Sequence, residues 1–560
     1  MSLMGSLYLG VSGLQTSHNA LNTTAHNMSN LDTEGYTRQQ VALATKGYNT
    51  ISKSSTVSWQ QLGLGVNYTQ TRQVRDYFLD LNYRRESGRN AFYEVSYNAM
   101  QEIEDILGES NEGHAFSEAI SNLWTSVQEL SKDPTSAVNQ NLFVTRSYEF
   151  ITKASAVYES LCDYQDNMNV SVKNDVDKIN QYAQAIEALN EQIVGIEAGD
   201  VEKANDLRDQ RNYYLDELGK MGNISYSEND LGYVSVKFEG VDLVKGGLVN
   251  TMSLYEDPET GFYTPYWEMF ATYTYDAEGH KVLTEESLDA AKVYDLTRTI
   301  ASDLNTDIGS LKGLLLARGD HRATALEIKD INTDGEYEEG WYDTHISQSI
   351  IMNIEAEFDQ LINAVTTKIN GILADAAEKE SAQYPNSTYL RDDNGNPIQL
   401  FTKIIDEQKS VTLADGTVVE TGWNVNNLEV NMDLRQNPSL LGFRLSDSAE
   451  DNATMEAMKK AFQETIYTLN PNVQTPVCFN DYYKNLVAQV ANSGSVFAAI
   501  QESQTVTVDS LSSAREQIVG VSSDEELTNM IMYQNAYNAS SRYINVISEM
   551  LEHILTTLGR

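Results

Sequence analysis

The residues best suited to chemistry are the oxygen donors of the run Asp330-Ile-Asn-Thr-Asp-Gly335. Acidic or amide side chains at alternate positions, followed by Gly, match the start of a calcium-binding loop. Such a loop ends in a bidentate Glu at its twelfth position, where this chain has Trp341. Because that ligand is missing, a turn built on Asx side chains is the better interpretation here, and also at the shorter run Asp392 to Asn396. We therefore expect no metal site.

Other motifs that carry chemistry are missing from the sequence. The 7 His residues are scattered without zinc-ligand spacing, and no nucleophile elbow, phosphate-binding loop or dinucleotide-binding fingerprint occurs. Among 81 acidic residues some pair will always lie close together, so a glycosidase-like dyad has no support. Cys162 and Cys478 match neither a disulfide framework nor a metal pair, and two buried apolar side chains are the better interpretation. We predict no catalytic residue and no cofactor.

Composition excludes two classes of partner. The chain has 39 Lys and Arg residues against 81 Asp and Glu residues, a formal charge of -42, so phosphate backbones and anionic lipids would repel it. No window approaches the roughly 18 consecutive apolar residues of a membrane span. The first residues also lack the basic start and continuous apolar core of a signal peptide. We expect no nucleic acid partner, no membrane insertion and no cleaved export signal.

The elements that would position functional side chains begin with an uncharged N-terminal helix. From Met1 to Leu31 there is no Asp, Glu, Lys or Arg, whereas the whole chain is strongly acidic. Apolar residues step by three and four along this segment, as in one stripe of a helix, and they include Leu7, Val11, Leu14, Leu21 and Met28. A core that serves one molecule leaves a charged outer face, so the uncharged faces predict contact with neighbouring copies. A helical core within a monomer is the alternative.

The C-terminal segment carries the clearest helical stripe of the chain. Its residues step by three and four almost to the last position, and the stripe consists of Met530, Tyr533, Tyr537, Ile544, Ile547, Leu551, Ile554 and Leu558. Helical regions at both ends surround a middle region rich in β-formers. This order predicts that the chain runs away from its N-terminal helix and later comes back to it, so that its two ends meet. We therefore expect the two terminal helices to pair as a coiled coil.

Long helices give way to strands between the two ends. An apolar seam from Val172 to Ile196 is followed, after a short break, by a second seam from Ala204 to Leu218. Two such seams can pack against each other, which predicts an antiparallel helical hairpin. Alternation from Val234 and the Gly246-Gly247 turn indicate strands. Residues 40–88 show short alternating runs, and we interpret them as an extended region.

These patterns together predict a multidomain α+β fold with discontinuous, nested domains. The expected parts are a terminal helical coiled-coil domain (1–40 with 505–560), a mainly helical rod-like domain (41–222 with 345–380 and 450–504), a β-rich outer domain (223–344) and an additional β-rich insertion (381–449). An alternative function is that of a surface enzyme or adhesin whose active or binding region lies in residues 245–450.

The segment Asn22 to Arg38, NTTAHNMSNLDTEGYTR, resembles the N-terminal signature of bacterial flagellar rod, hook and hook-associated proteins. The positions of that signature are occupied by Asn27, Asn30, Thr33, Gly35, Tyr36 and Arg38. Asn30 or Gly35 could adopt the left-handed conformation that ends a helix. The sequence departs from the signature at His26 and Glu34, where Asn and Pro are more usual.

The C-terminal end carries a matching resemblance. Glu526 to Tyr537 and Ser541 to Leu551 are similar to the terminal helix of the same family. Within the family, the long helical hairpin, the segment Asn205 to Arg211 and the segment Ser522 to Leu527 most resemble the hook-associated members. The hook and rod subunits are the alternatives.

This resemblance implies a structural subunit, not an enzyme, outside the cell at the junction between the flagellar hook and the filament. It implies export of the unfolded chain through the flagellar type III apparatus, after a dedicated chaperone has held the C-terminal helix. It further implies a ring of copies in contact with the hook protein and the next hook-associated protein. The assembly interface would then consist of the two terminal stripes and the signature residues.

Overall fold

The computed structural model describes residues 3–33, 35–53, 59–108, 116–199, 202–275, 281–405, 409–413, 416 and 418–558. The chain divides into two compact units, and each is assembled from segments that are far apart in the sequence. We call residues 1–89, 177–251 and 504–560 the terminal unit, and residues 90–176 and 252–503 the central unit. Helices and strands occur in both, so the predicted mixed architecture is confirmed.

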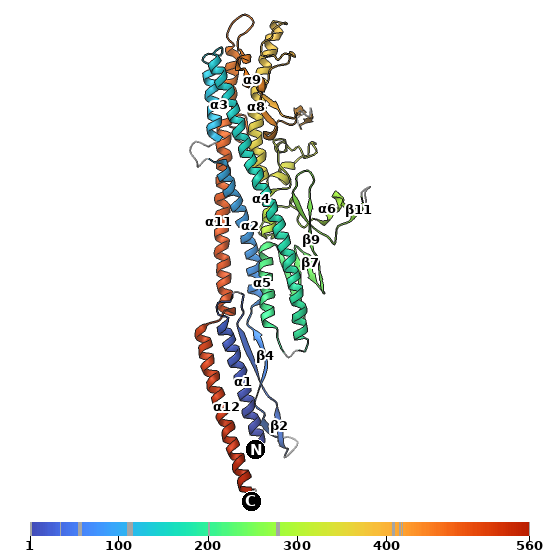
Figure 1. Ribbon diagram of the computed structural model, residues 1–560, viewed down its shortest axis with the longest axis vertical. Helices are drawn as coiled ribbons and strands as arrows, with labels where there is room; N and C mark the ends of the chain where they lie inside the picture. Colours follow the sequence, from blue (N-terminus) through green and yellow to red (C-terminus); the bar gives the residue numbers. More distant parts are fainter. Residues whose placement is uncertain are drawn as a thin grey trace. The chain divides into compact units, whose positions relative to one another are not determined.

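The terminal unit contains both terminal helices of the chain (Figure 1). Its own elements are α1 (Leu3–Ser29), β1 (Gln39–Thr45), β2 (Tyr48–Lys53), β3 (Trp59–Gly63), β4 (Val66–Gln73), α5 (Asn205–Met221), β5 (Ile224–Glu228), β6 (Val234–Phe238), β7 (Val241–Lys245), β8 (Leu248–Val249) and α12 (Ser523–Leu558). Long helices that contribute residues to both units are α2 (Tyr77–Leu107), α4 (Ala137–Glu197) and α11 (Phe479–Val519).

The helices α1 and α12 pack side by side in opposite directions (Figure 1). Gly10 lies against Ile544 and Gly13 lies against Ser540, so residue numbers rise along one helix as they fall along the other. The prediction that the two ends of the chain pair with each other is confirmed.

The segment after α1 forms an extended region that packs on this helix. Within it β1 pairs antiparallel with β4, and β2 pairs antiparallel with β3. The expectation of extended structure up to residue 88 is wrong at its C-terminal end, because α2 already begins at Tyr77. Asp76 starts this helix by accepting hydrogen bonds from the N–H groups of Phe78 and Leu79 at 2.9 and 3.2 Å. This capping signal is easily overlooked beside the alternating residues that precede it.

The predicted helical hairpin is present as α4 and α5. Leu189 and Ile193 of α4 pack with Ala204, which precedes α5, in a small apolar cluster. The antiparallel sheet β5-β6-β7-β8 is attached to α4 through Asn190, whose amide donates to the Val234 carbonyl at 2.9 Å and accepts from the Val234 N–H at 3.1 Å. Both bonds are buried, where an unsatisfied amide would cost stability.

Four elements of the central unit share one aromatic core. Phe116 contacts Phe150, Phe358 and Tyr483 at ring-centroid distances of 5.4, 5.1 and 5.0 Å, which joins α3, α4, α8 and α11. The elements found only in this unit are α3 (Phe116–Leu130), β9 (Met252–Glu256), β10 (Tyr263–Trp267), β11 (Tyr273–Tyr275), β12 (Lys281–Leu283), α6 (Glu285–Ala291), α7 (Ser310–Arg318), α8 (Ile350–Gln383), β13 (Phe401–Lys403), β14 (Ser410–Thr412), β15 (Val418–Glu420), β16 (Leu428–Val430), α9 (Met432–Gln436) and α10 (Asn452–Gln463). Within the described ranges, no helix combines the length and the apolar character that crossing a membrane requires.

Residues 223–344 are built differently from the β-rich outer domain that the sequence suggested. The sheet of residues 224–249 belongs to the terminal unit, whereas β9 to β12 belong to the central unit. After Leu283 the described chain of this stretch continues as α6, α7 and irregular structure. Strand propensity reports how residues suit a pleated surface and says nothing about which core that surface covers.

The two runs with calcium-like spacing form Asx turns. The Asn332 side-chain oxygen accepts from the N–H of Glu336 at 2.9 Å. Asp392 Oδ1 accepts from the N–H groups of Asn394 and Asn396 at 2.9 and 2.8 Å. These oxygens are therefore occupied by backbone donors, and the turn interpretation is confirmed.

Candidate functional site

Small side chains form the buried face of α1. Gly10, Ser17, Ala20, Thr24 and Asn27 are buried, and the half-buried Gly13 continues the same series of three- and four-residue steps. A Cβ atom added to Gly10 would lie 2.7 Å from Ile544 Cγ1, and one added to Gly13 would lie 2.8 Å from Ser540 Oγ. Side-chain atoms do not approach each other so closely, so glycine is what permits this spacing of the two helices.

The predicted apolar stripe of α1 lies beside this face rather than in it. Leu7, Leu14, Leu21 and Met28 are half-buried, and Val11 is exposed. The closest contact with α12 is therefore made at Gly10 and Gly13, since the larger side chains of the stripe do not fit a gap set by glycine. That they contact neighbouring copies stays a prediction.

The predicted stripe of α12 is the covered side of that helix. Ile547 is buried, and half-buried side chains along the stripe are Met530, Tyr533, Tyr537, Ile544 and Leu551. Ile544 lies against Gly10, and the ring of Tyr537 is 6.3 Å from that of His18. Ile554 is exposed, and the side chain of Leu558 lies outside the described residues.

Large apolar side chains also occupy outward positions of both terminal helices. On α1, Tyr8 is 72% exposed and Leu9 is 39% exposed. On α12 the exposed apolar side chains outside the predicted stripe are Leu527, Ile531, Met532, Tyr543, Val546, Met550 and Leu555. Single exposed apolar residues are normal on a protein surface, but a series along a whole helix is typical of a contact surface.

The signature residue Asn27 fixes the loop that follows α1. Its buried side chain pairs with the backbone of Gln39, donating to the carbonyl oxygen at 2.9 Å and accepting from the N–H at 3.0 Å. The Tyr36 hydroxyl donates to the same Asn27 oxygen at 2.8 Å. An amide offers one donor group and one acceptor, so Asn27 takes the place of a neighbouring strand at the start of β1.

Asn30 and Gly35 shape the turn inside this loop. Asn30 donates from Nδ2 to the His26 carbonyl at 3.0 Å and accepts from the Thr33 hydroxyl at 3.2 Å. Gly35 has a φ of 77°, the left-handed conformation that favours glycine. The left-handed residue that the sequence placed at Asn30 or Gly35 is thus Gly35, after α1 has ended at Ser29.

Arg38 joins the loop to the C-terminal segment. Its guanidinium lies 2.8 Å from a Glu525 oxygen and 3.0 Å from a Glu526 oxygen, both in the first turn of α12. Its backbone N–H donates to the carbonyl of Val519, the last residue of α11, at 2.8 Å. Because Glu526 is buried, this charge-assisted contact is stronger than an ordinary surface pair.

A buried ion network lies where α11 approaches α2 and α5 in the terminal unit. The Arg515 guanidinium is 2.9 Å from an Asp80 oxygen and 2.6 Å from an Asp216 oxygen. Arg84 reaches the other Asp216 oxygen at 2.6 Å. Burial acts to raise the pKa of Asp216, but the guanidinium groups of Arg84 and Arg515 outweigh it and lower that pKa. The network thus fixes the end of α11 next to the Arg38 contact.

A buried carboxylate on α5 also holds the loop. Asp209 accepts from the Thr37 N–H at 3.1 Å and from the Gln73 amide at 2.7 Å, and it lies 3.9 Å from the Arg75 guanidinium. Burial raises the pKa of Asp209 to about 6, and the Thr37 hydrogen bonds and Arg75 offset only part of that effect.

Asp209 makes the stability of the terminal unit depend on pH. Its folded-state pKa lies above its unfolded value of about 3.9, so its contribution is fully present below about pH 4 and is lost as pH rises through 6. We expect Asp209→Asn to remove this loss, which amounts to roughly 3 kcal/mol. Urea unfolding of both proteins at about pH 4 and about pH 7 measures the difference. Glu202→Gln, at an exposed position of the same unit, should behave like the wild type, and an unchanged pH dependence in Asp209→Asn would contradict the assignment.

The site is built to hold segments in place. A cavity of about 700 Å³ beside the loop is lined by signature residues and by Tyr213, Glu217 and Arg515. Within the described part of the chain, no group of three His, Cys, Asp or Glu side chains could hold a metal ion. The signature side chains are engaged with backbone groups and with Glu525 and Glu526, so the arrangement fixes the geometry of the two chain ends.

Sequence reasoning found the signature residues and missed the groups that surround them. Asp209 and Asp216 carry no local signal that separates them from the other acidic residues. The small face of α1 does carry a signal, since Gly10, Gly13, Ser17 and Ala20 step by three and four. A search for small residues at helical spacing would have found it beside the apolar stripe.

Family models match the middle and both ends of the chain. The model of the flagellar hook-associated protein FlgK helical domain matches residues 100–380. The model described as flagella basal body rod protein matches residues 7–37. The model described as flagellar basal body rod FlgEFG protein C-terminal matches residues 516–557. The two end models thus cover α1 with its loop and α12.

Similar proteins extend over nearly the whole chain. Flagellar hook-associated protein 1 of Bacillus subtilis is 25% identical over 575 aligned residues, which covers 99% of each chain. Proteins of the same name from Salmonella typhimurium and Escherichia coli are 23% and 22% identical, covering 97% of this chain and 98% of theirs. The fold is similar to that of the flagellar hook junction protein FlgK from Burkholderia pseudomallei, with a TM-score of 0.53 and 12% identity over 79% of this chain and 100% of that one. The resemblance seen at the two ends is confirmed, and because the helical-domain model alone spans half of the residues, this chain belongs to the flagellar hook-associated protein FlgK family.

Proposed function

We propose that this protein is an axial subunit at the junction between the flagellar hook and the filament and is needed for filament assembly. Its family consists of structural flagellar proteins, so the protein is a structural component of the flagellum and not an enzyme. Family membership also implies association with copies of itself and with other axial proteins. The junction is supported by the solved relative, which is described as a hook junction protein.

The apolar outer surface of the terminal helix pair carries this proposal. Tyr8 and Leu555 are 72% and 73% exposed, and the series on α12 from Leu527 to Met550 is exposed with them. Full burial of one large apolar side chain contributes about 1.5–3 kcal/mol. Neighbouring helix pairs in a ring of copies would cover these side chains, so assembly would be driven mainly by the residues that face away from the intramolecular contact.

The same surface supports the proposals about export. A C-terminal helix with exposed apolar residues on its outer side needs a cover before assembly, which favours a dedicated chaperone on α12. We propose that the chain is exported unfolded through the flagellar type III apparatus and then contacts the hook protein and the next hook-associated protein outside the cell. We further propose that residues 381–449, which contain the small sheets of β13 to β16, form an additional insertion within the central unit.

Negative charge on the outward side of α12 should abolish assembly without unfolding the subunit. Val546 and Met550 are 46% and 49% exposed, so Val546→Glu combined with Met550→Glu should change the free energy of unfolding by less than about 1 kcal/mol. Filaments counted by electron microscopy, in the native bacterium lacking its own copy, should fall to near zero. Thr152→Glu combined with Ser160→Glu adds the same charge at exposed positions of α4 and should leave filaments in place. Normal filaments from the α12 variant would overturn the proposal.

Electron microscopy of isolated flagella carrying a tagged chain tests the location separately. Label confined to the junction between hook and filament is the expected result. Label along the hook or within the rod would replace the proposal with the alternative of a hook or rod subunit.

A further inference from the structure

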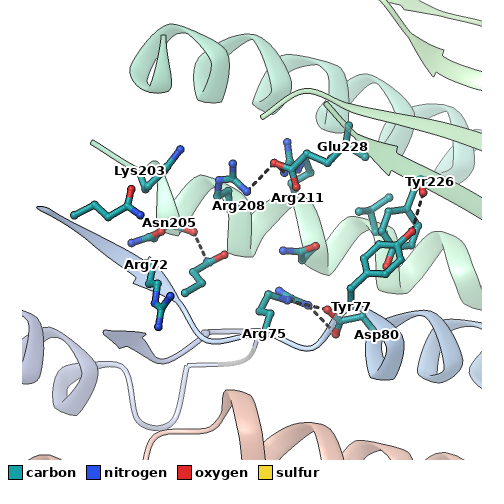
Figure 2. Close-up of a pocket in the computed structure, with 15 residues that line it drawn as sticks. Arg72, Arg75, Tyr77, Asp80, Lys203, Asn205, Arg208, Arg211, Tyr226 and Glu228 are labelled. Atoms are coloured by element: carbon teal, nitrogen blue, oxygen red, sulfur yellow. Dashed lines mark hydrogen bonds and ion pairs between the residues drawn. The ribbon is translucent and has the colours of Figure 1, made fainter. Parts of the chain in front are cut away.

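A cavity of about 360 Å³ in the terminal unit has more cations than carboxylates in its lining, although the chain as a whole is acidic. It lies among β4, the start of α2, α5 and β5 (Figure 2). The basic side chains in its lining are Arg72, Arg75, Lys203, Arg208 and Arg211, against two carboxylates, Asp80 and Glu228. The chain has 81 acidic and 39 basic residues, so the usual ratio is reversed in this cavity.

Four of these cations have carboxylate partners. Arg75 lies 2.9 Å from an Asp80 oxygen. Arg208 lies 2.7 Å from oxygens of both Glu197 and Glu228, and Lys203 lies 3.2 Å from Glu197. Asp209 also lies 3.9 Å from Arg75, so four carboxylates face the five cations and positive charge remains in excess by one.

Arg211 is buried without full compensation. Its side chain is 2% exposed, and the closest carboxylate, that of Glu228, is 3.5 Å away. Its Nε has no hydrogen-bond partner among the described residues. Burial lowers the pKa of Arg211 to about 10, which is the sign expected of a cation that lacks negative charge nearby.

Arg72 is an exposed cation in the lining of the cavity. It lies on β4 opposite Gln40 of β1, its side chain is exposed, and it takes part in none of the ion pairs found in the described part of the chain. Figure 2 shows Arg72 near Asn205, on the side of the cavity where α5 begins. A guanidinium group offers paired donors that match the two oxygens of a carboxylate.

The N-terminus of α5 adds further positive potential at the same place. The N-cap residue is Ala204, which has no side chain that can accept from the first turn. Lys203 and Asn205, on either side of it, both line the cavity. The helix dipole makes such an end attractive to an anion, and the Glu197 carboxylate already accepts from the Ala204 N–H at 3.0 Å.

We propose that this cavity binds the carboxylate of an exposed acidic side chain from a second copy of the chain. A carboxylate supplies the single charge and the planar oxygen pair that suit Arg72, and 360 Å³ is room for one side chain with its immediate backbone. Every copy presents acidic side chains, since the formal charge is -42, and copies that repel each other overall need local sites of attraction. The inference rests on the proposed self-assembly, to which it adds one specific contact.

Sedimentation velocity of the full chain at low ionic strength tests this contact. Arg72→Gln is expected to weaken self-association by about tenfold, because one charge-assisted pair is lost. Arg444→Gln removes the same charge from an exposed position of the central unit and should have no effect. Inorganic phosphate replacing chloride at equal ionic strength should compete, weakening association of the wild type but not that of Arg72→Gln.

The outcomes separate this inference from the proposed function. If the wild type associates, Val546→Glu with Met550→Glu prevents it and Arg72→Gln does not change it, the cavity contact is refuted while assembly through α12 stands. If phosphate raises the unfolding temperature only when Arg72 is present, yet both proteins associate equally, the cavity takes free oxyanions and the assignment to a second copy is overturned. A wild type that stays monomeric at all concentrations refutes the cavity contact, while the proposed function is decided separately by the filament counts.

Discussion

Replacing both Gly10 and Gly13 with leucine is expected to separate α1 from α12. Even the first side-chain atom at these positions would lie 2.7 Å from Ile544 and 2.8 Å from Ser540. Each overpacked position costs about 1–3 kcal/mol, and in the described chain α12 has no other extensive contact that could compensate. The helix pair should therefore be lost while the rest of the molecule stays folded.

Hydrogen exchange measures this separation directly. Amides of α12 should exchange at least about tenfold faster in the Gly10→Leu, Gly13→Leu variant, and amides of α3 and α8 in the central unit should not change. Ala25→Leu is the matched control, because Ala25 lies on the same helix at an exposed position. Unchanged protection of α12 in the double variant would show that the glycine contacts do not set the spacing of the helices.

Removing the Asp216 carboxylate should destabilise the terminal unit by about 3–5 kcal/mol, since it leaves a buried guanidinium without its partner. Arg84 has a side chain that is only 2% exposed, and Asp216 is its carboxylate partner at 2.6 Å. Asp216→Ala also frees one side of Arg515, which keeps its contact with Asp80. The loss should therefore fall mainly on Arg84.

Chemical unfolding of Asp216→Ala provides the measurement, with a second variant as its control. Asp216→Leu combined with Arg84→Met replaces the buried pair with apolar groups of similar size and should recover most of the lost stability. The lowered pKa of Asp216 means that its contribution is present above the unfolded pKa and disappears as pH falls through the folded value. Equal stabilities of the two variants would show that the unpaired charge is not the cause.

Periodic patterns predicted the elements that depend on local spacing. The stripe of α12 is its covered side, and the seams of α4 and α5 form the expected hairpin. The signature from Asn27 to Arg38 also forms one site, because its turn is made by contacts between residues close in sequence. Such features follow from repeats of 3.6 residues and from turn chemistry, which a single sequence contains.

The sequence was less informative where a contact depends on the size of side chains or on residues that lie far apart in the chain. Apolar periodicity pointed to Leu14 and Leu21, but α1 and α12 approach each other most closely at Gly10 and Gly13. Hydropathy does not distinguish these glycines from the other small residues of α1. Among 81 acidic residues only the folded chain shows which carboxylates meet a guanidinium, as Asp216 does. The strands between residues 224 and 283 were expected in one domain and are divided between two cores, because strand propensity carries no information about the core.

The ion pair between Arg38 and Glu526 joins residues that are 488 positions apart, and the α1–α12 contact extends even further along the chain. Because α12 follows α1 by most of the chain's length, α1 can find its place only after synthesis has reached α12. Most of the loop that must close consists of segments able to fold beforehand, which limits the entropic cost of closure. A chain in which α12 has not yet been synthesised cannot have formed this helix pair. The helix pair thus forms only in a chain that has been synthesised at least as far as α12.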